Sequence, residues 1–356
     1  MSEFDKYIVQ GEPDKKAKAN AWQTAIGLQD VDGLKPSEYL IKTAVQHIEG
    51  DITIDQVKDM LDTYYQTKDV REHLDDERTE EADKVSARIT EILSEQSFSF
   101  TPDYLLRIHR RLFEGIYKHA GKLRDVNITK KEWVLSGDTV LYSNYDMLRE
   151  TLEYDFEQEK KTDYSVLNAD MAVKQICKFV SGIWQIHPFR EGNTRTTAVF
   201  TMKWLQTFGF SVDNDVFKDN SWYFRNALVR ANYNNIPKRI FATSEYLELF
   251  FRNLLFGEQN KLSNRTMLAG ELQSATAEVS KSQNDTLDGT LNCNLDELAL
   301  LRFVKENPNA TQIEIAKHIG KSERTVKRMT PALIERGLLE RENGKRNGRW
   351  IVMCEL

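Results

Sequence analysis

The sequence predicts a mostly α-helical fold with a small separate domain at its C-terminal end. Apolar residues recur at helical spacing through most of the 356 residues. Strand character is confined to a stretch near residue 135 and to the last 20 residues or so. A stretch rich in Ser, Thr, Asn and Gly begins at residue 257 and is typical of a linker.

Composition limits the classes of protein to which the chain can belong. An apolar content of 40% over this length is enough for two or three globular domains. The sequence contains no apolar run of the roughly 18 residues that a membrane span needs, and MSEFDKYIVQGEPDKK lacks the apolar core of a signal peptide. Cys177, Cys293 and Cys354 lie far apart, which argues against disulfides and thiolate metal sites. We therefore expect a cytoplasmic protein without a membrane partner.

The net charge of −6 is unevenly distributed. Residues 293–356 contain 12 Lys and Arg against 9 Asp and Glu, a net charge of +3, so the rest of the chain carries −9. A mildly basic C-terminal part follows an acidic body.

Residues 1–70 are expected to form a small helical unit. Amphipathic segments at 17–29 and 37–48 are joined by the turn-like 32–36, and a third helix is expected after Thr53. The run DVREHLDDERTEEADK is mostly charged, and we interpret it as the solvated face of a helix rather than a binding site.

The segment from Thr101 to 142 combines a helix with the main candidate hairpin. Core spacing of apolar residues predicts a helix over TPDYLLRIHRRLFEGIY. WVL and TVLY flank Ser136-Gly137-Asp138, which predicts a short hairpin at 132–142. A lone hairpin is marginal in water, so we expect it to pair with a partner; a loop without strands is the alternative.

The sequence HPFREGNTRT, residues 187–196, lies between two predicted buried helices. Apolar periodicity predicts one helix over 169–186 and another that Gly209 ends. The turn Gly192-Asn193-Thr194 opens the second helix, and a helix N-terminus offers free N–H groups to an anion such as phosphate. Arg195 could reach a phosphate oxygen, and Asn193 could orient the turn or donate to the same group.

The remaining side chains of this motif suggest catalysis. Glu191 near a phosphate makes sense if Mg²⁺ lies between them, because Mg²⁺ binds one carboxylate together with substrate phosphates. His187 titrates near neutrality and could accept a proton from an attacking hydroxyl, while Phe189 is expected to anchor the loop. A lone His or Glu is more often structural, and only the combination favours a site.

HPFREGNTRT resembles the signature of the Fic family, HPFx(D/E)GNGRxxR, with seven of its nine specified positions matched. Members of this family transfer AMP from ATP to a hydroxyl of a target protein. The resemblance implies that His187 deprotonates a target Ser, Thr or Tyr and that Glu191 holds Mg²⁺. It also implies that the phosphates of ATP are cradled by Gly192, Asn193, Thr194 and Arg195.

The resemblance extends over about residues 75–255, which suggests a catalytic domain at 71–256. IHRRLFEGIYKHAGKLRDVNI is similar to the upstream helix and turn of the family. The hairpin at 132–142 is similar to the flap that aligns a target segment, and YFRNALVRANYNN to the adenine-side helix, where Asn232 would contact the base. Cores of this family often self-associate, so a homo-oligomer is a further expectation.

Two positions depart from the signature. Thr194 replaces its second glycine and can still offer a backbone N–H, whereas Ala198 replaces its second arginine, which in the family holds the γ-phosphate end of ATP. The donor could therefore be ATP, another nucleotide or the donor of a kinase-like phosphotransfer.

The N-terminal unit resembles the antitoxin domain that some Fic proteins carry, in which a Glu is inserted against the second arginine. The matching place here has Leu28, Asp32 and Gly33, so both members of the inhibitory pair are altered. We hypothesise that Glu-mediated inhibition is weakened or replaced, with Asp32 as the candidate inhibitory residue. Glu49 before Gly50 is a second candidate, and a purely structural packing unit is the alternative.

Residues 257–293 are expected to be a linker, and 294–356 resemble a winged helix-turn-helix domain. LDELALLRFVKEN, TQIEIAKHIG and SERTVKRMTPALIERG supply three helices, the second capped by Thr311 and Glu314, and LLERENGKRNGRWIVM supplies a wing. The third helix would face the major groove of DNA and the wing its phosphates. The candidate contact residues are Ser322, Arg324, Thr325, Lys327, Arg328, Lys345, Arg346 and Arg349.

Three classes of function remain open at this point. The first is a Mg²⁺-dependent protein adenylyltransferase, and the second is a related phosphotransferase or other-nucleotide transferase. The third is a DNA-binding regulator whose Fic core senses nucleotides. Winged helices also dock proteins, so DNA as the partner of the C-terminal domain is one of two interpretations.

Overall fold

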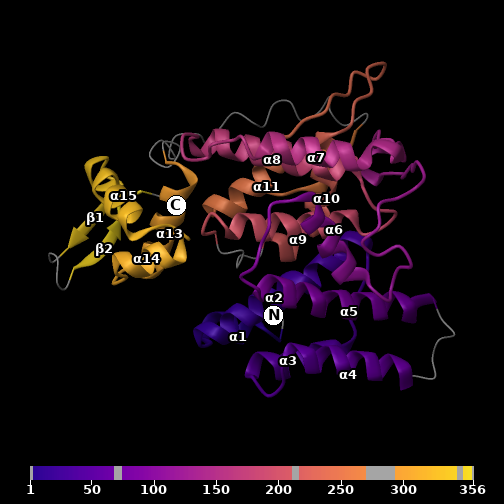
Figure 1. The fold of residues 1–356 in the computed structure, drawn as a ribbon, viewed down its shortest axis with the longest axis horizontal. Helices are drawn as coiled ribbons and strands as arrows, with labels where there is room; N and C mark the ends of the chain where they lie inside the picture. Colours follow the sequence, from indigo (N-terminus) through magenta and orange to yellow (C-terminus); the bar gives the residue numbers. More distant parts are fainter. Residues whose placement is uncertain (1–2, 68–73, 211–215, 270–292, 343–347, 355–356) are drawn as a thin grey trace.

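The computed structural model describes residues 3–67, 74–210, 216–269, 293–342 and 348–354, which form layers of helices with a small domain at one end (Figure 1). The N-terminal helices are α1 (Asp5–Gln10), α2 (Pro13–Gly27), η1 (Leu28–Asp32), α3 (Glu38–Glu49) and α4 (Ile54–Thr67). The middle of the chain forms α5 (Leu74–Ser94), α6 (Pro102–Phe113), η2 (Trp133–Leu135), η3 (Tyr145–Met147), α7 (Leu148–Glu159), α8 (Ala169–Ile186), α9 (Asn193–Gln206), α10 (Val216–Ala231), α11 (Glu245–Phe256) and η4 (Asn264–Met267). The C-terminal elements are α13 (Leu295–Glu306), α14 (Gln312–His318), α15 (Glu323–Glu335), β1 (Leu339–Glu342) and β2 (Arg349–Val352).

Helix boundaries follow local capping chemistry. The side chains of Ser37, Thr101 and Asn168 accept hydrogen bonds from backbone N–H groups in the first turns of α3, α6 and α8. Thr311 and Glu314 form the capping box that the sequence predicted for α14. The mostly helical fold and the C-terminal winged helix are therefore confirmed.

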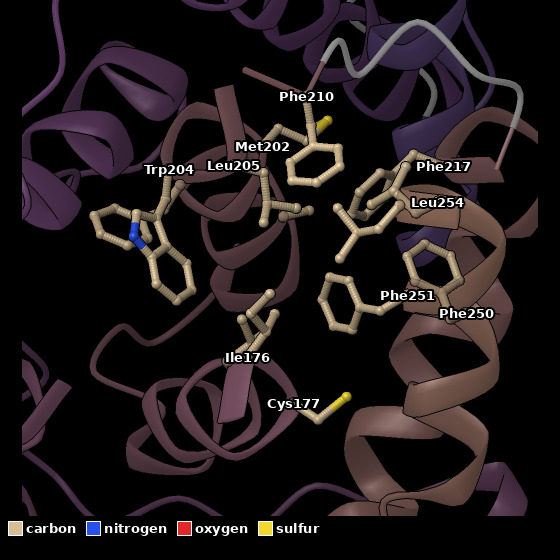
Figure 2. Packing of buried hydrophobic residues seen from close by; sticks show 14 of the residues in the cluster. Ile176, Cys177, Met202, Trp204, Leu205, Phe210, Phe217, Phe250, Phe251 and Leu254 are labelled. Carbon is tan, nitrogen blue, oxygen red and sulfur yellow. The ribbon is translucent and has the colours of Figure 1, made fainter. Parts of the chain in front are cut away.

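The main core lies where α8, α9, α10 and α11 meet. Figure 2 shows aromatic and aliphatic side chains from these helices and the adjoining segment that belong to one buried cluster, among them Trp204, Phe210, Phe217 and Phe250. The helices are apolar on the faces turned toward one another, because burial of apolar surface is the main force that packs them. This core holds α8 and α9 firmly on either side of the loop 187–192.

The N-terminal unit has its own small core but is joined to the rest of the protein through α2 and η1. Ala25, Leu28 and Val31 belong to the main core, and the hydroxyl of Ser221 on α10 donates to the carbonyl of Gly27 at 2.7 Å. In Figure 1, α2 and α5 lie side by side beneath the layer of α6, α9 and α10, and α3 and α4 lie on the far side of them.

We expected the charged run DVREHLDDERTEEADK to be the solvated face of a helix. The part of this run within α5 is not simply solvated. Asp83 on α5 is fully buried and accepts hydrogen bonds from the backbone and hydroxyl of Ser37 and from the hydroxyl of Tyr65. Glu81 contacts the motif helix α9. Two of the acidic residues thus serve as partners for buried groups, because an unpaired polar group in the interior would be costly.

The predicted hairpin at 132–142 is wrong. A turn does form, since the N–H of Glu132 donates to the carbonyl of Asp138 at 2.9 Å, but the flanking segments make no β-ladder. Residues 133–135 form the 3-10 helix η2 instead, and the carbonyl of Val134 accepts from the N–H of Ala269 at 2.8 Å. Residues up to 269, which we expected to be linker, therefore pack on the core, and 270–292 lie outside the described residues.

The C-terminal domain docks directly on the helical core. β1 and β2 pair antiparallel, with Leu339 opposite Val352, and form the predicted wing. One guanidinium nitrogen of Arg302 on α13 donates to the carbonyls of Leu254 and Leu255 at the end of α11. Gly209, after α9, has φ +81°, and a Cβ there would lie 2.7 Å from the Cα of Ile319. Only glycine permits this close approach.

No helix within the described residues is both long and apolar enough to cross a bilayer.

Candidate functional site

The loop between α8 and α9 has an unusual backbone at both ends. His187 follows the last residue of α8 and has φ +51°, a left-handed conformation that is uncommon for residues other than glycine. Gly192 precedes α9 with φ +75°, and a Cβ there would lie 2.4 Å from the ring of Phe113. Glycine is therefore required at this position, and the turn brings the first N–H groups of α9 to the loop.

His187 is buried, with one ring nitrogen paired and the other open. Its Nδ1 lies 3.2 Å from the carbonyl of Trp184, so Nδ1 carries the hydrogen that is donated there. Its Nε2 has no protein partner among the described residues and keeps its lone pair. Burial lowers the pKa of His187 well below its ordinary value, and the positive charge of Lys130 lowers it further. A neutral imidazole with a free Nε2 is the form that accepts a proton.

Arg124, which the sequence did not single out, holds the backbone around His187. Its Nε donates to the carbonyl of His187 at 2.8 Å, and its N–H donates to the carbonyl of Pro188 at the same distance. Its other guanidinium nitrogens donate to carbonyls of Val126, Ser143 and Ile186. One buried guanidinium thereby supplies hydrogen bonds to carbonyls that the left-handed turn leaves without partners in a helix.

Asn193 and His109 fix the rest of the loop. The amide of Asn193 donates to the carbonyl of Phe189 and accepts from its N–H, so Asn193 orients the turn and does not point at a ligand. His109 accepts from the N–H of Gly121 at Nδ1, so its Nε2–H donates to the carbonyl of Glu191 at 3.0 Å. Its ring stacks on buried Phe189, with ring centroids 3.7 Å apart, which agrees with the expected anchoring role of Phe189.

Thr194 replaces the glycine of the signature without filling the turn. Its hydroxyl accepts from the indole N–H of Trp184 at 2.9 Å, so the side chain faces the core. The backbone N–H of Thr194 stays at the start of α9, where helical N–H groups have no partner within the helix. The positive end of the helix dipole and these groups together make an anion site.

Glu191 is the only motif carboxylate, and its side chain is 56% exposed. Its Oε2 lies 2.9 Å from the ammonium of Lys130. The described residues contain no group of three or more His, Cys, Asp or Glu that could hold a metal by themselves. Glu191 therefore fits Mg²⁺ only when substrate phosphates supply the other ligands, which is a common arrangement for this ion.

Arg195 is not free to meet a phosphate in this conformation. Its side chain is 1% exposed; its Nε lies 2.9 Å from Oδ2 of Asp32, and one terminal nitrogen lies 2.5 Å from Oε1 of Glu81. The side-chain oxygen of Gln29 and the hydroxyl of Tyr117 accept hydrogen bonds from the terminal nitrogens of Arg195 at 3.0 and 3.2 Å. Burial alone would lower the pKa of Arg195, but Asp32, Tyr117 and Glu81 together raise it.

The candidate inhibitory residue thus meets the first motif arginine. Asp32 ends η1 and reaches Arg195, while Ala198, in place of the second arginine, is fully buried in the core. Glu49, the other candidate, pairs with Lys15 and Tyr7 inside the N-terminal unit. Glu81 on α5 was not anticipated, because a residue 114 positions away from Arg195 leaves no trace in local patterns.

Asn232 lies just after α10 and joins it to α8. Its amide nitrogen donates to the carbonyls of Ser181 and Leu228, both at 3.0 Å. Both amide hydrogens are used, so the oxygen is the atom left to accept a hydrogen bond from a ligand.

The candidate DNA-contacting residues divide into three groups. Ser322, Arg324, Lys327 and Arg328 are exposed at the N-terminal part of α15, although Lys327 pairs with Glu323 at 2.6 Å. The hydroxyl groups of Ser322 and Thr325 lie 2.9 Å apart and help to cap this helix. Arg349 pairs across the wing with Glu342, and Lys345 and Arg346 lie outside the described residues.

Comparison with known proteins agrees with this geometry. Residues 99–205 match the Fic/DOC family, and residues 297–340 match the winged helix-turn-helix DNA-binding family. The chain carries a Fic/DOC domain. Over 120 residues it is 28% identical to protein adenylyltransferase VbhT of Bartonella schoenbuchensis, a stretch that covers 33% of this chain and 24% of that protein. The similarity thus spans only about a quarter of the length of that relative.

Proposed function

We propose that this protein is a Fic-type adenylyltransferase that transfers AMP from ATP to a Ser, Thr or Tyr hydroxyl of a target protein, which can be the protein itself. The observation that carries the proposal is the neutral, buried imidazole of His187, whose Nε2 has no protein partner among the described residues and which lies on the loop that leads into the N-terminus of α9. A base beside a phosphate site is the combination that hydroxyl attack on a nucleotide requires.

The chemical step moves one proton and exchanges one phosphorus–oxygen bond. The hydroxyl oxygen attacks the α-phosphorus, the bond from that phosphorus to the pyrophosphate oxygen breaks, and Nε2 of His187 accepts the hydroxyl proton. The N–H groups at the start of α9 would stabilise the charge on the phosphate oxygens. A Mg²⁺ ion held by Glu191 and the phosphates would offset their negative charge. The oxygen of Asn232 would accept from the amine of adenine.

Because Ala198 replaces the second arginine of the signature, a second transferase reaction also has to be considered. Without the arginine that holds the γ-phosphate end of ATP in the Fic family, the donor could be another nucleotide, or the γ-phosphate itself could be transferred. Both reactions would use the same base, so only the fate of each phosphate separates them.

Labelled ATP distinguishes these reactions. Purified protein is incubated with Mg²⁺ and with ATP labelled at either the α- or the γ-phosphate, and wild type is compared with His187→Ala by gel and intact mass. AMP transfer predicts α-label on wild type and none on the variant. Label from the γ-position alone would replace the proposal by phosphotransfer. If neither wild type nor Asp32→Ala gains label from any nucleotide, a DNA-binding regulator would explain the protein better than a transferase.

The contacts of Arg195 suggest how the N-terminal unit would act on this reaction. We infer that Asp32 restrains Arg195 and so competes with a phosphate for the same guanidinium. This is inhibition at the first motif arginine, which is consistent with the loss of the second at Ala198. A unit that serves only packing is the alternative.

DNA binding by the winged helix is a second proposed function, favoured by one observation. The N-terminal part of α15 exposes Arg324, Lys327 and Arg328 on a side that does not pack on the Fic domain. In winged helices this part of the third helix enters the major groove.

A further inference from the structure

Neither arginine position of the signature supplies a free cation to the triphosphate end of the proposed site. Arg195 is buried and held by two carboxylates, and Ala198 provides no charge. A triphosphate nevertheless carries several negative charges, and the N–H groups of one helix turn offset only part of them. Besides a Mg²⁺ ion, another cation of the chain near Glu191 would offset part of the remaining charge.

Lys130 is positioned to supply this charge. Its ammonium lies 2.9 Å from the carboxylate of Glu191, and its side chain is 26% exposed, so the ammonium can exchange partners. The positive charge of Lys130 also lowers the pKa of His187, the proposed base. Lys130 thus pairs with the carboxylate expected to face the phosphates, and its charge acts on the imidazole expected to face the target hydroxyl.

The backbone that carries Lys130 is firmly held. Its N–H donates to the hydroxyl of Thr139 at 3.3 Å, and Glu132 two residues later is fully buried. Glu132 pairs with Arg225 of α10, where the nearest nitrogen and oxygen lie 2.7 Å apart, and accepts from the hydroxyl of Tyr142. The ring centroid of Tyr142 lies 4.3 Å from that of His187. This cluster fixes the backbone from which the partly exposed side chain of Lys130 extends to Glu191.

We propose that Lys130 binds the β- and γ-phosphates of the donor nucleotide and takes the place of the arginine that Ala198 lacks. Without nucleotide, Lys130 pairs with Glu191; when a nucleotide binds, the ammonium leaves this carboxylate for a phosphate oxygen. A partly exposed ion pair contributes little to stability, so this exchange has a low cost, whereas a bond from an ammonium to a phosphate is charge-assisted. The proposal rests on the proposed function, since it assumes a nucleotide in this site.

Nucleotide binding tests the proposal without requiring catalysis. ATP, ADP and adenosine are titrated calorimetrically into the full-length protein, with and without Mg²⁺, for wild type, Lys130→Ala and Lys130→Arg. Lys131→Ala serves as the matched control, because Lys131 is adjacent and exposed. All four proteins are also prepared with Asp32→Ala, which frees Arg195 from one partner.

We expect Lys130→Ala to weaken ATP binding by about tenfold, the usual effect of losing one charge-assisted bond. Lys130→Arg should retain most of the affinity, and adenosine should bind all variants equally, which also shows that the site is folded. Equal ATP affinity in Lys130→Ala and Lys131→Ala would overturn the proposal, as would an equal loss for ATP and adenosine.

The proposed function can fail separately. ATP binding that depends on Lys130 without any transfer of label would support the role of Lys130 and count against AMP transfer. Transfer of AMP by the wild type, together with equal ATP affinity in wild type and Lys130→Ala, would support AMP transfer and count against the role of Lys130. No ATP binding by any of the proteins would overturn both.

Discussion

His109 shows how a residue outside the motif determines the shape of the motif loop. Its two ring nitrogens link Gly121, after α6, to the carbonyl of Glu191, and its ring stacks on Phe189. Both bonds need a neutral ring with its hydrogen on Nε2. Protonation would turn the acceptor nitrogen into a donor that faces the N–H of Gly121.

This geometry makes the stability of the Fic domain sensitive to acid. Burial lowers the pKa of His109 to about 3, whereas an unfolded histidine has a pKa of about 6.5. The unfolded chain therefore binds the proton more tightly, so the contribution of His109 is full above about pH 6.5 and is lost as the pH falls toward 3. The expected loss is about 2 kcal/mol of unfolding free energy between about pH 7 and pH 5.

Chemical denaturation of wild type and His109→Gln across this range measures the effect. Glutamine can accept and donate at similar positions but does not titrate, so we expect a shallower pH dependence for the variant, by about this amount. Parallel curves of unfolding free energy against pH for the two proteins would show that the pKa of His109 is the same in the folded and unfolded states.

The ion pair between Asp32 and Arg195 leads to a second prediction, which concerns the rate of AMP transfer. Asp32→Ala should raise the rate of AMP transfer by about fivefold, because the side chain is 39% exposed and a pair of that kind contributes about 1 kcal/mol. Glu81 should continue to hold part of the guanidinium. Asp30→Ala is the matched control, since Asp30 is exposed on the same η1 and makes no ion pair with any described residue.

Initial rates of target or self-modification under the same nucleotide concentration give the comparison. A rate that does not change in Asp32→Ala, or that rises equally in Asp30→Ala, would indicate that the N-terminal unit serves packing rather than inhibition.

The sequence predicted the motif residues but not their supports. His187, Glu191 and Arg195 could be proposed as site residues because their types and spacing are local. Phe189 could be predicted as an anchor because it is a large apolar residue in a polar loop. Arg124 and Glu81 could not, since each acts on residues more than 60 positions away through contacts that only the folded chain creates.

At the scale of elements, α5 connects the N-terminal unit to the Fic domain. Asp83 accepts from the N–H of Ser37 at 2.8 Å and from the hydroxyl of Tyr65 at 2.7 Å, so one carboxylate joins α5 to the start of α3 and to α4. The hydroxyl of Ser37, which caps α3, also donates to it. The hydroxyl of Tyr65 and the carboxylate of Asp83 are buried and Ser37 is partly buried, so these donors rely largely on the carboxylate for their hydrogen bonds.

Asp83→Ala should loosen α3 and α4 in particular. Leaving buried donors without an acceptor costs about 2–3 kcal/mol, which corresponds to about 30- to 100-fold faster hydrogen exchange wherever these helices open locally. Hydrogen exchange measured by mass spectrometry over residues 38–67 would detect the change. Glu77→Ala, an exposed change on the same helix, should leave the exchange as in wild type. Equal protection in both variants would show that apolar packing alone holds the N-terminal unit.

Predictions of elements succeeded where one apolar face decided the structure and failed where polar contacts did. α6 and α8 follow their apolar periodicity, and α9 forms as predicted although it is buried on all sides. The segment 132–142 alternates like a hairpin, yet Glu132 is drawn into a buried pair with Arg225, and Val134 bonds to Ala269 instead of to a facing strand. Neither partner lies near enough in sequence to have been anticipated.

At the scale of the whole molecule, the winged helix forms one body with the Fic domain. The bonds from Arg302 to the end of α11 and the close approach of Gly209 to Ile319 place α14 against the end of α9 (Figure 1). The same α9 begins at the turn that we propose binds phosphate, so the motif and the winged helix lie at opposite ends of one 14-residue helix. The sequence predicted the domain but not this docking, which depends on surface shape.

DNA binding is the prediction that belongs to this scale. Replacing Arg324, Lys327 and Arg328 by Ala should weaken binding to duplex DNA. The slope of log K against log salt should fall by about one for each DNA phosphate that the variant no longer neutralises. Fluorescence anisotropy over a series of salt concentrations measures both quantities. His187→Ala should bind DNA like wild type, because the motif lies at the far end of α9.

The control must match the charge removed, since an acidic protein binds DNA less well whenever it loses any three cations. Replacing the exposed lysines Lys122, Lys160 and Lys161 of the Fic domain removes the same charge away from α15. A larger decrease in affinity and in the slope of log K against log salt in the α15 variant than in this control would show that α15 contacts the DNA. Equal losses in both would mean that only net charge matters, and the winged helix would then be better explained as a protein-docking module that fixes α9 and α11.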